Sequence, residues 1–308
     1  AIVNVRMATM TDVVVDVGGG AGPAGAPSLG PLREEPLDGD VHAFDQTMLA
    51  TFPADDALAV VETAVAPLIV DRMSTGGLWL AEPARLGGYG SSWRQTSIVL
   101  GGLDVTDPVR IGTPLVRAPQ DAIDSLLVST TLLPASVGGP GPHVTIVPKT
   151  AARDRYIATE IAAIPSVLRG TNSQPGLPSI ARFAMHRDAN AQLGAPIGSR
   201  TGLFVAIRHT ATDRLERDDA TRLRTRVNSL VASASVATGT SGRLRLSATG
   251  DRAAMPYPGR ARIRDRTVRE SATFATGQAS WDRWTAGGTA WSAALGLAQG
   301  TLSPALGA

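Results

Sequence analysis

Cysteine is absent from the 308 residues of this chain. Its absence excludes a disulfide-stabilised miniprotein, a thiolate nucleophile and a zinc site built on cysteine. Aromatic residues are scarce, at 4%, and charged residues make up only 18%. The 33 glycines and 21 prolines together exceed the ordinary share of these residues. A compact helical enzyme is therefore disfavoured.

Lysine is nearly absent too, because Lys149 is the only one among 29 basic residues. So general a preference for arginine indicates genome composition rather than a phosphate-binding surface, and no nucleic-acid partner is predicted. The charges are unevenly distributed. Residues 1–150 carry 8 basic and 16 acidic side chains, whereas residues 151–308 carry 21 and 11. This split predicts two parts with different roles.

No stretch of the sequence is suited to a membrane-spanning helix. Residues 126–148 and 284–308 are each long enough to span a bilayer as a helix, and neither contains Asp, Glu, Lys or Arg. The first contains four prolines and the second several glycines, and both residue types break or weaken helices. If this protein contacts lipid, it does so with strands.

From residue 151 onward, apolar and polar residues alternate with a period of two. Leu244 and Leu246 alternate with Arg243, Arg245 and Ser247, and residues 189–193, 203–212 and 291–298 repeat the pattern. Successive side chains of a strand point to opposite faces. Each segment therefore predicts a strand with one apolar face and one small or polar face.

Seven strands are predicted, at residues 153–163, 188–197, 201–212, 226–238, 243–251, 272–284 and 289–300. Their connections alternate between long and short. The short ones, residues 198–200, 239–242 and 285–288, contain glycine, whereas the long ones carry proline, aspartate and arginine. Short turns on one side and long loops on the other are typical of outer-membrane β-barrels.

A soluble antiparallel sandwich is the alternative, because it also alternates apolar and polar residues. The long strands, the alternating loop lengths and the position of Trp281, Trp284 and Trp291 near one set of strand ends favour the membrane interpretation. Bacterial single-chain barrels have an even number of strands and no free edge. Seven strands therefore predict an incomplete barrel from a truncated chain.

The first half predicts a compact α+β unit after a Gly/Pro-rich linker over residues 18–40. A helix is expected from Asp55 to about Ala66, then a short strand near Leu78 and a glycine-rich loop at residues 87–90. Strands are expected at residues 96–100 and from 103, around the turn Gly101-Gly102. A helical turn at residues 121–124, a strand at 125–130 and a last strand at 144–147 complete a small mixed sheet.

The order of these motifs resembles the plug domain of TonB-dependent outer-membrane receptors. "TSIVLGGLDVTDP" (residues 96–108) and "PQDAIDSLLVSTTLLPASVGGPGPHVTIVPKT" (residues 119–150) carry the resemblance, and "DANAQLGAPI" followed by "GLFVAIRHT" is similar to the first barrel hairpin of that family. The usual "DG" turn is Gly101-Gly102 here, and glycine supplies the same positive φ. The resemblance implies three parts: an N-terminal strand remnant and linker (residues 1–50), a plug domain (51–150) and barrel strands (151–308).

The N-terminal segment, residues 1–17, leaves two interpretations open. It resembles either the last strand of a carboxypeptidase-regulatory-like sandwich or a degenerate TonB box. In the second case Asp12, Val13, Val14 and Val15 would contact the TonB protein by adding a strand to it.

An enzyme is not expected. Gly20, Gly22 and Gly25 have the G-x-G-x-x-G spacing of S-adenosylmethionine-dependent methyltransferases, but the prolines that follow prevent the helix such a loop opens. That activity remains a minor alternative. The scattered histidines and the acidic residues near Asp45 do not have metal-ligand spacing, so no metal site and no cofactor are predicted.

The resemblance implies active import of a solute across the bacterial outer membrane, with the plug domain gating the barrel. The implied partners are the TonB complex, a small-molecule or oligomeric solute, and outer-membrane lipid with lipopolysaccharide. Residues of the outward plug loops that combine stacking faces with both signs of charge are candidates for solute binding: Tyr89, Trp93, Arg94, Asp104, Asp107 and Arg110. The sequence identifies neither the solute nor the oligomeric state.

Overall fold

The computed structural model describes most, but not all, of the chain. The described residues are 3–10, 14–16, 41–52, 57–70, 84–88, 90–108, 111–130, 141–150, 155–165, 182–215, 222–256, 269–284 and 290–305. None of the helices within these ranges is both long and apolar enough to cross a membrane.

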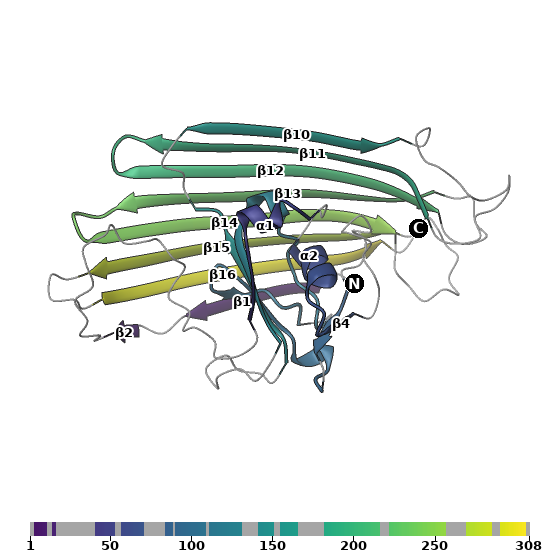
Figure 1. Ribbon diagram of the computed structural model, residues 1–308, viewed down its shortest axis with the longest axis horizontal. Coiled ribbons are helices and arrows are strands. Elements are labelled where there is room, and N and C mark those ends of the chain that lie inside the picture. Colours follow the sequence, from purple (N-terminus) through teal and green to yellow (C-terminus); the bar gives the residue numbers. More distant parts are fainter. Residues whose placement is uncertain are drawn as a thin grey trace.

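Long antiparallel strands form one large curved sheet, which we call the wall (Figure 1). Its strands in chain order are β10 (Tyr156–Ile164), β11 (Arg182–Ile197), β12 (Thr201–Leu215), β13 (Arg222–Ala237), β14 (Gly242–Pro256), β15 (Arg269–Trp284) and β16 (Ala290–Ala305). Each pairs with the next, so the spatial order follows the sequence, and the sheet remains open between β10 and its far edge. The seven predicted strands and the incomplete barrel are confirmed.

Two N-terminal strands extend the wall beyond β16. β1 (Val3–Met10) pairs antiparallel with residues 295–302, and β2 (Val14–Asp16) pairs with residues 290–292. This segment was predicted to belong to a part separate from the barrel, and its pairing with β16 was not predicted. An unpaired strand edge exposes a row of backbone donors and acceptors, and β1 and β2 satisfy part of that row on β16.

The predicted alternation of short and long connections is present, but one long connection is much shorter than predicted, because β12 and β13 reduce it from residues 213–225 to residues 216–221. The short connections span residues 198–200, 238–241 and 285–289, and the long ones span 165–181, 216–221 and 257–268. We call the two sides of the wall its short-connection end and its long-connection end. Several strands extend further toward the long-connection end than predicted: β11 begins at Arg182 instead of 188, and β14 continues to Pro256 instead of ending at 251.

The two faces of the wall differ in the way that the sequence predicted. One face, the outward face, presents exposed apolar side chains: Ile157, Ile161, Leu193, Ile207, Leu230, Leu246, Trp281, Trp291, Leu295 and Leu297. The other, the inward face, carries buried polar ones: Asp188, Asn190, Thr210, Ser229, Ser233, Thr249, Asp251 and Thr276. Leu295 and Leu297 are 60% and 54% exposed, so they do not form a dry core. Soluble sandwiches show the opposite distribution.

A smaller mixed sheet forms the plug domain and packs against the inward face. Its strand order is β3 (Val41–Asp45), β8 (Ile123–Ser129), β9 (His143–Pro148), β6 (Ser97–Leu100) and β7 (Leu103–Asp104), with β6 and β9 parallel. Figure 1 shows α1 (Gln46–Leu49), α2 (Ala57–Ala64) and β4 (Leu68–Val70) grouped beside the wall strands. β3 belongs to this sheet although it precedes residue 51, where the plug domain was predicted to begin.

Most plug elements lie where the sequence placed them. The turn Gly101-Gly102 has φ values of +59° and +94°, which only glycine adopts readily. The expected helical turn is a 3₁₀ turn, η2 (Gln120–Ala122). The glycine-rich loop differs, since Leu86, Gly87 and Gly88 form strand β5 and pair with β4. Asp55, where the helix was expected to begin, and the strand expected near Leu78 lie outside the described residues.

The plug core follows from alternation along its strands and from one helical face. Ile98 and Leu100, Leu126 and Val128, Val144 and Ile146 are each at most 2% exposed, and α2 adds Leu58, Val60 and Val61. Burying one such side chain contributes roughly 1.5–3 kcal/mol. Phe274 and Ala298 of the wall belong to the same apolar cluster. The plug domain is thus packed against the wall rather than tethered to it.

Candidate functional site: the contact between plug and wall

Two plug segments reach the inward face at different levels along the wall. Near the short-connection end, Leu103 lies against Gly296, where an added Cβ would come within 3.0 Å of Leu103 Cδ1. Nearer the long-connection end, Leu115 lies against Gly300, and the backbone NH of Arg117 donates to Asp251 Oδ2 at 2.7 Å. The glycines of β16 leave room for plug side chains. The plug therefore has a fixed height inside the curved wall.

The Gly101-Gly102 turn makes a close contact with β15. Gln278 Nε2 donates to the carbonyl oxygen of Leu100 at 2.7 Å, and a Cβ on Gly101 would lie 2.9 Å from Gln278 Oε1. A cavity of about 110 Å³ lies between this turn and the wall. Its lining includes Lys149 of the plug and Ser233, Arg245 and Ser247 of the wall. The turn is therefore hydrogen-bonded to the wall on one side and lies next to the cavity on another.

We expect Gly101→Val to weaken this contact. Valine is strained at the positive φ of this position, and its side chain would clash with Gln278. We therefore expect the substitution to destabilise the contact between the turn and the wall by about 1–3 kcal/mol. Hydrogen exchange of the β6 amides in the whole protein measures the effect. Gly198→Ala is the control, because Gly198 has a φ of +69° but no atom within 4 Å of an added Cβ. Equal effects on β6 from both variants would show that the Gln278 contact is unimportant.

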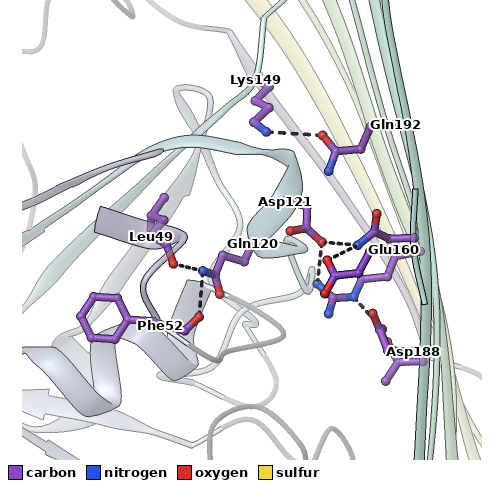
Figure 2. A network of polar contacts seen from close by, with 11 residues as sticks. Leu49, Phe52, Gln120, Asp121, Lys149, Glu160, Asp188 and Gln192 are labelled. Atoms are coloured by element: carbon purple, nitrogen blue, oxygen red, sulfur yellow. Dashed lines mark hydrogen bonds and ion pairs between the residues drawn. The ribbon is translucent and has the colours of Figure 1, made fainter. Parts of the chain in front are cut away.

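An ionic network joins η2 to the wall (Figure 2). Asp121 Oδ2 accepts from Asn190 Nδ2 at 2.9 Å and from Arg208 Nη1 at 3.1 Å. Arg208 Nε donates to Asp188 Oδ1 at 2.8 Å, and the Thr210 hydroxyl donates to the same oxygen at 2.7 Å. Arg208 thus bridges one plug carboxylate and one wall carboxylate. We call Asp121, Asp188, Asn190 and Arg208 the latch.

Neighbouring contacts hold the latch in place. Gln120 Nε2 donates to the carbonyl oxygens of Leu49 and Phe52, which ties η2 to α1 within the plug (Figure 2). Lys149 Nζ donates to Gln192 Oε1 at 3.4 Å, and the Lys149 carbonyl oxygen accepts from the Ser233 hydroxyl at 2.9 Å. The start of β8 and the end of β9 are therefore both bonded to the wall.

Burial shapes the electrostatics of the latch. It raises the pKa of the Asp121 carboxyl, the positive charge of Arg208 opposes that change, and the carboxylates of Glu160 and Asp188 reinforce it. Burial likewise lowers the pKa of the Lys149 ammonium, against the attraction of Asp121 and Asp124. Charge at these positions is costly and depends on its partners. The latch therefore stabilises the contact between plug and wall only while all of its charged partners are present, and loss of one partner destabilises that contact.

His143, at the start of β9, gives the plug a pH dependence. Burial lowers the pKa of its imidazole from 6.5, and nearby Asp104 only partly opposes this. Below pH 6.5 the unfolded chain therefore binds more protons than the folded one, so plug stability falls as the pH falls through this window. We expect faster exchange of β9 amides at pH 5 than at pH 7.5 after correction for intrinsic rates. His143→Leu should abolish the difference, whereas His42→Leu should keep it.

The predicted solute-binding residues are only partly brought together. Trp93 is 44% exposed at η1 (Trp93–Gln95), and Arg85 Cζ lies 5.8 Å from its ring centroid. The loop that begins at Asp107 approaches it, since a Cβ on Gly112 would lie 2.5 Å from the Trp93 carbonyl oxygen. Arg94 is exposed beside Trp93. Tyr89 and Arg110 lie outside the described residues.

Asp104 has a local structural role instead. Its Oδ1 accepts a hydrogen bond from the backbone NH of Thr106 at 2.8 Å. In the sheet, Asp104 of β7 pairs with Val99 of β6, next to the Gly101-Gly102 turn. It is therefore separated from Trp93, which precedes the opposite end of β6. Whether any of these residues binds solute stays a prediction.

The candidate TonB-contact segment is partly described. Val14 and Val15 belong to β2 and pair with Ser292 and Trp291, whereas Asp12 and Val13 lie outside the described residues. The methyltransferase-like glycines lie outside them too.

The latch was missed by sequence reasoning. The "DAI" turn was expected as a local structure, Asn190 and Arg208 were interpreted only as polar-face residues of two strands, and Asp188 was only the first residue of a predicted strand. The available signal was the occurrence of opposite charges on the inward faces of two neighbouring strands, beside a plug motif that begins with an aspartate.

Solved structures resemble this chain, although no protein-family model and no curated protein sequence matches it. The siderophore receptor PirA from Pseudomonas aeruginosa has a TM-score of 0.61 at 14% identity, with 86% of this chain and 41% of that chain covered. The alcaligin outer-membrane receptor FauA from Bordetella pertussis has a TM-score of 0.62 at 15% identity, with 88% and 40% covered. The siderophore receptor PirA from Acinetobacter baumannii has a TM-score of 0.62 at 13% identity, with 84% and 40% covered.

These comparisons extend to the arrangement of both parts. The chain spans about two fifths of the length of each receptor, and the match includes plug and wall together. The structures it resembles are transport receptors rather than enzymes. The chain has the fold of the plug domain and the first barrel strands of TonB-dependent outer-membrane receptors.

Proposed function

We propose that this chain is part of an active importer, in which the plug domain gates a β-barrel in the bacterial outer membrane. One observation carries the proposal: the wall exposes its apolar side chains outward and buries polar ones against a plug. An apolar exterior is favourable in lipid, and a polar interior is typical of barrels that enclose a solute path. A soluble binding or adhesion protein would leave this apolar face in water, at a cost that argues against it.

Gating requires contacts that hold the plug and can be broken. The latch, the Gln278 bond and the Arg117–Asp251 bond meet this requirement, since each joins one plug segment to one wall strand. A cavity beside the Gly101-Gly102 turn gives that turn somewhere to move. We propose that rearrangement begins at the latch and at this turn, driven by the TonB protein.

The N-terminal segment is the proposed attachment for TonB. If Asp12, Val13, Val14 and Val15 add a strand to that partner, β2 first has to leave β16. Three residue pairs hold β2 there, and individual backbone hydrogen bonds contribute only about 0.5–1.5 kcal/mol net, so exchange of partners is feasible.

Ferric siderophores are the solute class to test first, because the resembling receptors bear siderophore or enterobactin in their names. Exposed Trp93 and Arg94 suit an aromatic, anionic ligand, with stacking and charge pairing respectively.

Uptake into cells that express the whole protein tests the proposal. We expect a labelled ferric siderophore to accumulate in cells with TonB and to stay at background in matched cells without it. The control expresses the protein without residues 12–15, which we expect to insert in the outer membrane but not to transport. Recovery of the protein from the soluble fraction without detergent would contradict the proposal.

A further inference from the structure

The outward face of the wall changes character toward the long-connection end. Register places Ala189, His209, Asn228 and Arg252 in one row across four strands. The next row contains Arg187, Ala211, Arg226 and Ala254. The row before them, toward the short-connection end, contains Ile207 and Leu230. An apolar surface therefore adjoins a basic one along a defined line.

The basic side chains in these rows are exposed, and three of them line one hollow. Arg187, His209, Arg226 and Arg252 are all exposed, and we call them the basic patch. A hollow of about 530 Å³ is lined by Arg187, His209 and Arg226 together with Ile161 and Met185. Arg224 also lines it, but its guanidinium is paired with Asp213 at 2.7 and 2.9 Å.

The patch retains unused binding capacity. Within the described ranges, Arg226 and Arg252 have neither a hydrogen-bond partner nor an ion-pair partner for their side chains. His209 Nδ1 lies 2.8 Å from Asn228 Oδ1, so the imidazole is oriented by the neighbouring strand. Guanidinium groups match phosphate geometry with two parallel hydrogen bonds, and such charge-assisted bonds are among the strong ones.

Resting on the proposed function, we infer that the basic patch binds the phosphorylated headgroup of an outer-leaflet lipid. In outer-membrane barrels the long loops lie outside the cell, so the patch lies at the level of the outer headgroups. The acyl chains of that lipid lie over the adjoining apolar rows, where Ile161 is 85% and Ile207 54% exposed. A soluble anion would gain nothing from these side chains, which favours a lipid as the occupant.

Lipid binding by the whole protein, purified from outer membranes in mild detergent, tests the inference. The probes are a diphosphorylated glycolipid, the same lipid after removal of its phosphates, and inorganic phosphate, with bound lipid counted by native mass spectrometry. Arg226→Gln/Arg252→Gln removes two charges from the patch. Arg200→Gln/Arg283→Gln removes two exposed charges at the short-connection end and is the matched control.

The patch variant is expected to bind the phosphorylated lipid at least about ten-fold more weakly, since two charge-assisted contacts are lost. The control should bind within about two-fold of the unmodified protein, and the dephosphorylated lipid should bind weakly to all three. Equal losses in both variants, retained binding of the dephosphorylated lipid, or complete displacement by inorganic phosphate would each overturn the inference. Siderophore uptake by the same variants is measured separately, so transport without lipid binding leaves the proposed function intact.

Discussion

Replacement of Arg208 by methionine is expected to release η2 and the start of β8 from the wall. The Arg208 side chain is 10% exposed, and its guanidinium contacts the carboxylates of Asp188 and Asp121, whose side chains are 3% and 29% exposed. Methionine keeps most of the side-chain volume but removes the charge. Removing one partner of a buried ionic network leaves the other charges uncompensated, which costs about 3–5 kcal/mol.

Hydrogen exchange of residues 120–129 in the whole protein measures this release. If these amides exchange through a local opening that breaks the latch, a loss of about 3 kcal/mol in the free energy of that opening makes their exchange roughly a hundred-fold faster. Entry of a large antibiotic that the intact protein excludes is a second readout, because an unlatched plug is expected to leak.

Arg224→Met is the matched control for the latch. Arg224 makes a two-bond pair with Asp213, but both residues belong to the wall. We expect it to leave exchange at residues 120–129 unchanged. If both variants accelerate this segment equally, the effect comes from general loss of wall stability and the latch has no special role.

Asp121→Asn should disturb the same contact much less than Arg208→Met. Burial already raises the pKa of the Asp121 carboxyl, so the site penalises its negative charge, and asparagine retains an oxygen that accepts from Arg208 and Asn190. We expect the asparagine variant to keep exchange at residues 120–129 within about ten-fold of the unmodified protein. A hundred-fold acceleration would show that the charge of Asp121 is essential.

The wall strands were predictable where the outward face is apolar. Residues 243–248 alternate apolar with small or polar residues, and period-two alternation is sufficient to identify a strand with two unlike faces. Toward the long-connection end the outward residues become Arg187, Arg226 and Arg252, while apolar side chains such as Val227 and Met255 are buried on the inward face, so the pattern of apolar-outward and polar-inward residues is lost. The strands continue because backbone pairing does not require an apolar face. The predicted ends therefore fell short at the basic patch.

The plug was predictable from local chemistry, whereas its contacts were not. Positive φ at Gly101 and Gly102 follows from glycine itself, and the alternation of Leu126 and Val128 follows from burial on one face. The partners of Asp121 lie 69 and 87 residues away along the chain, and nothing local specifies them. The paired residues of β1 and β16, such as Val3 and Leu302, are much further apart along the chain. Predicting such long-range contacts requires knowing how every strand of the wall is aligned with its neighbours.

Leu246→Arg separates a lipid-facing wall from a water-facing one. Leu246 is 44% exposed on the outward face, and its neighbours in register, Ala234 and Ala279, are also apolar. An arginine on the lipid side of a barrel costs about 2–4 kcal/mol near the middle of the bilayer and about 0–1 near its surfaces. At an exposed site in water, a substitution usually changes stability by less than about 0.5 kcal/mol.

The denaturant midpoint of the whole protein folded into lipid vesicles measures this cost. Thr273→Arg is the control, because Thr273 is exposed in the row that already contains Arg252 and should accept arginine almost without loss. Leu246→Ser removes the apolar side chain without adding a charge and is expected to fall between the two. If Leu246→Arg and Thr273→Arg shift the midpoint equally, the outward face does not contact hydrocarbon, and an importer that crosses the membrane with these strands is excluded.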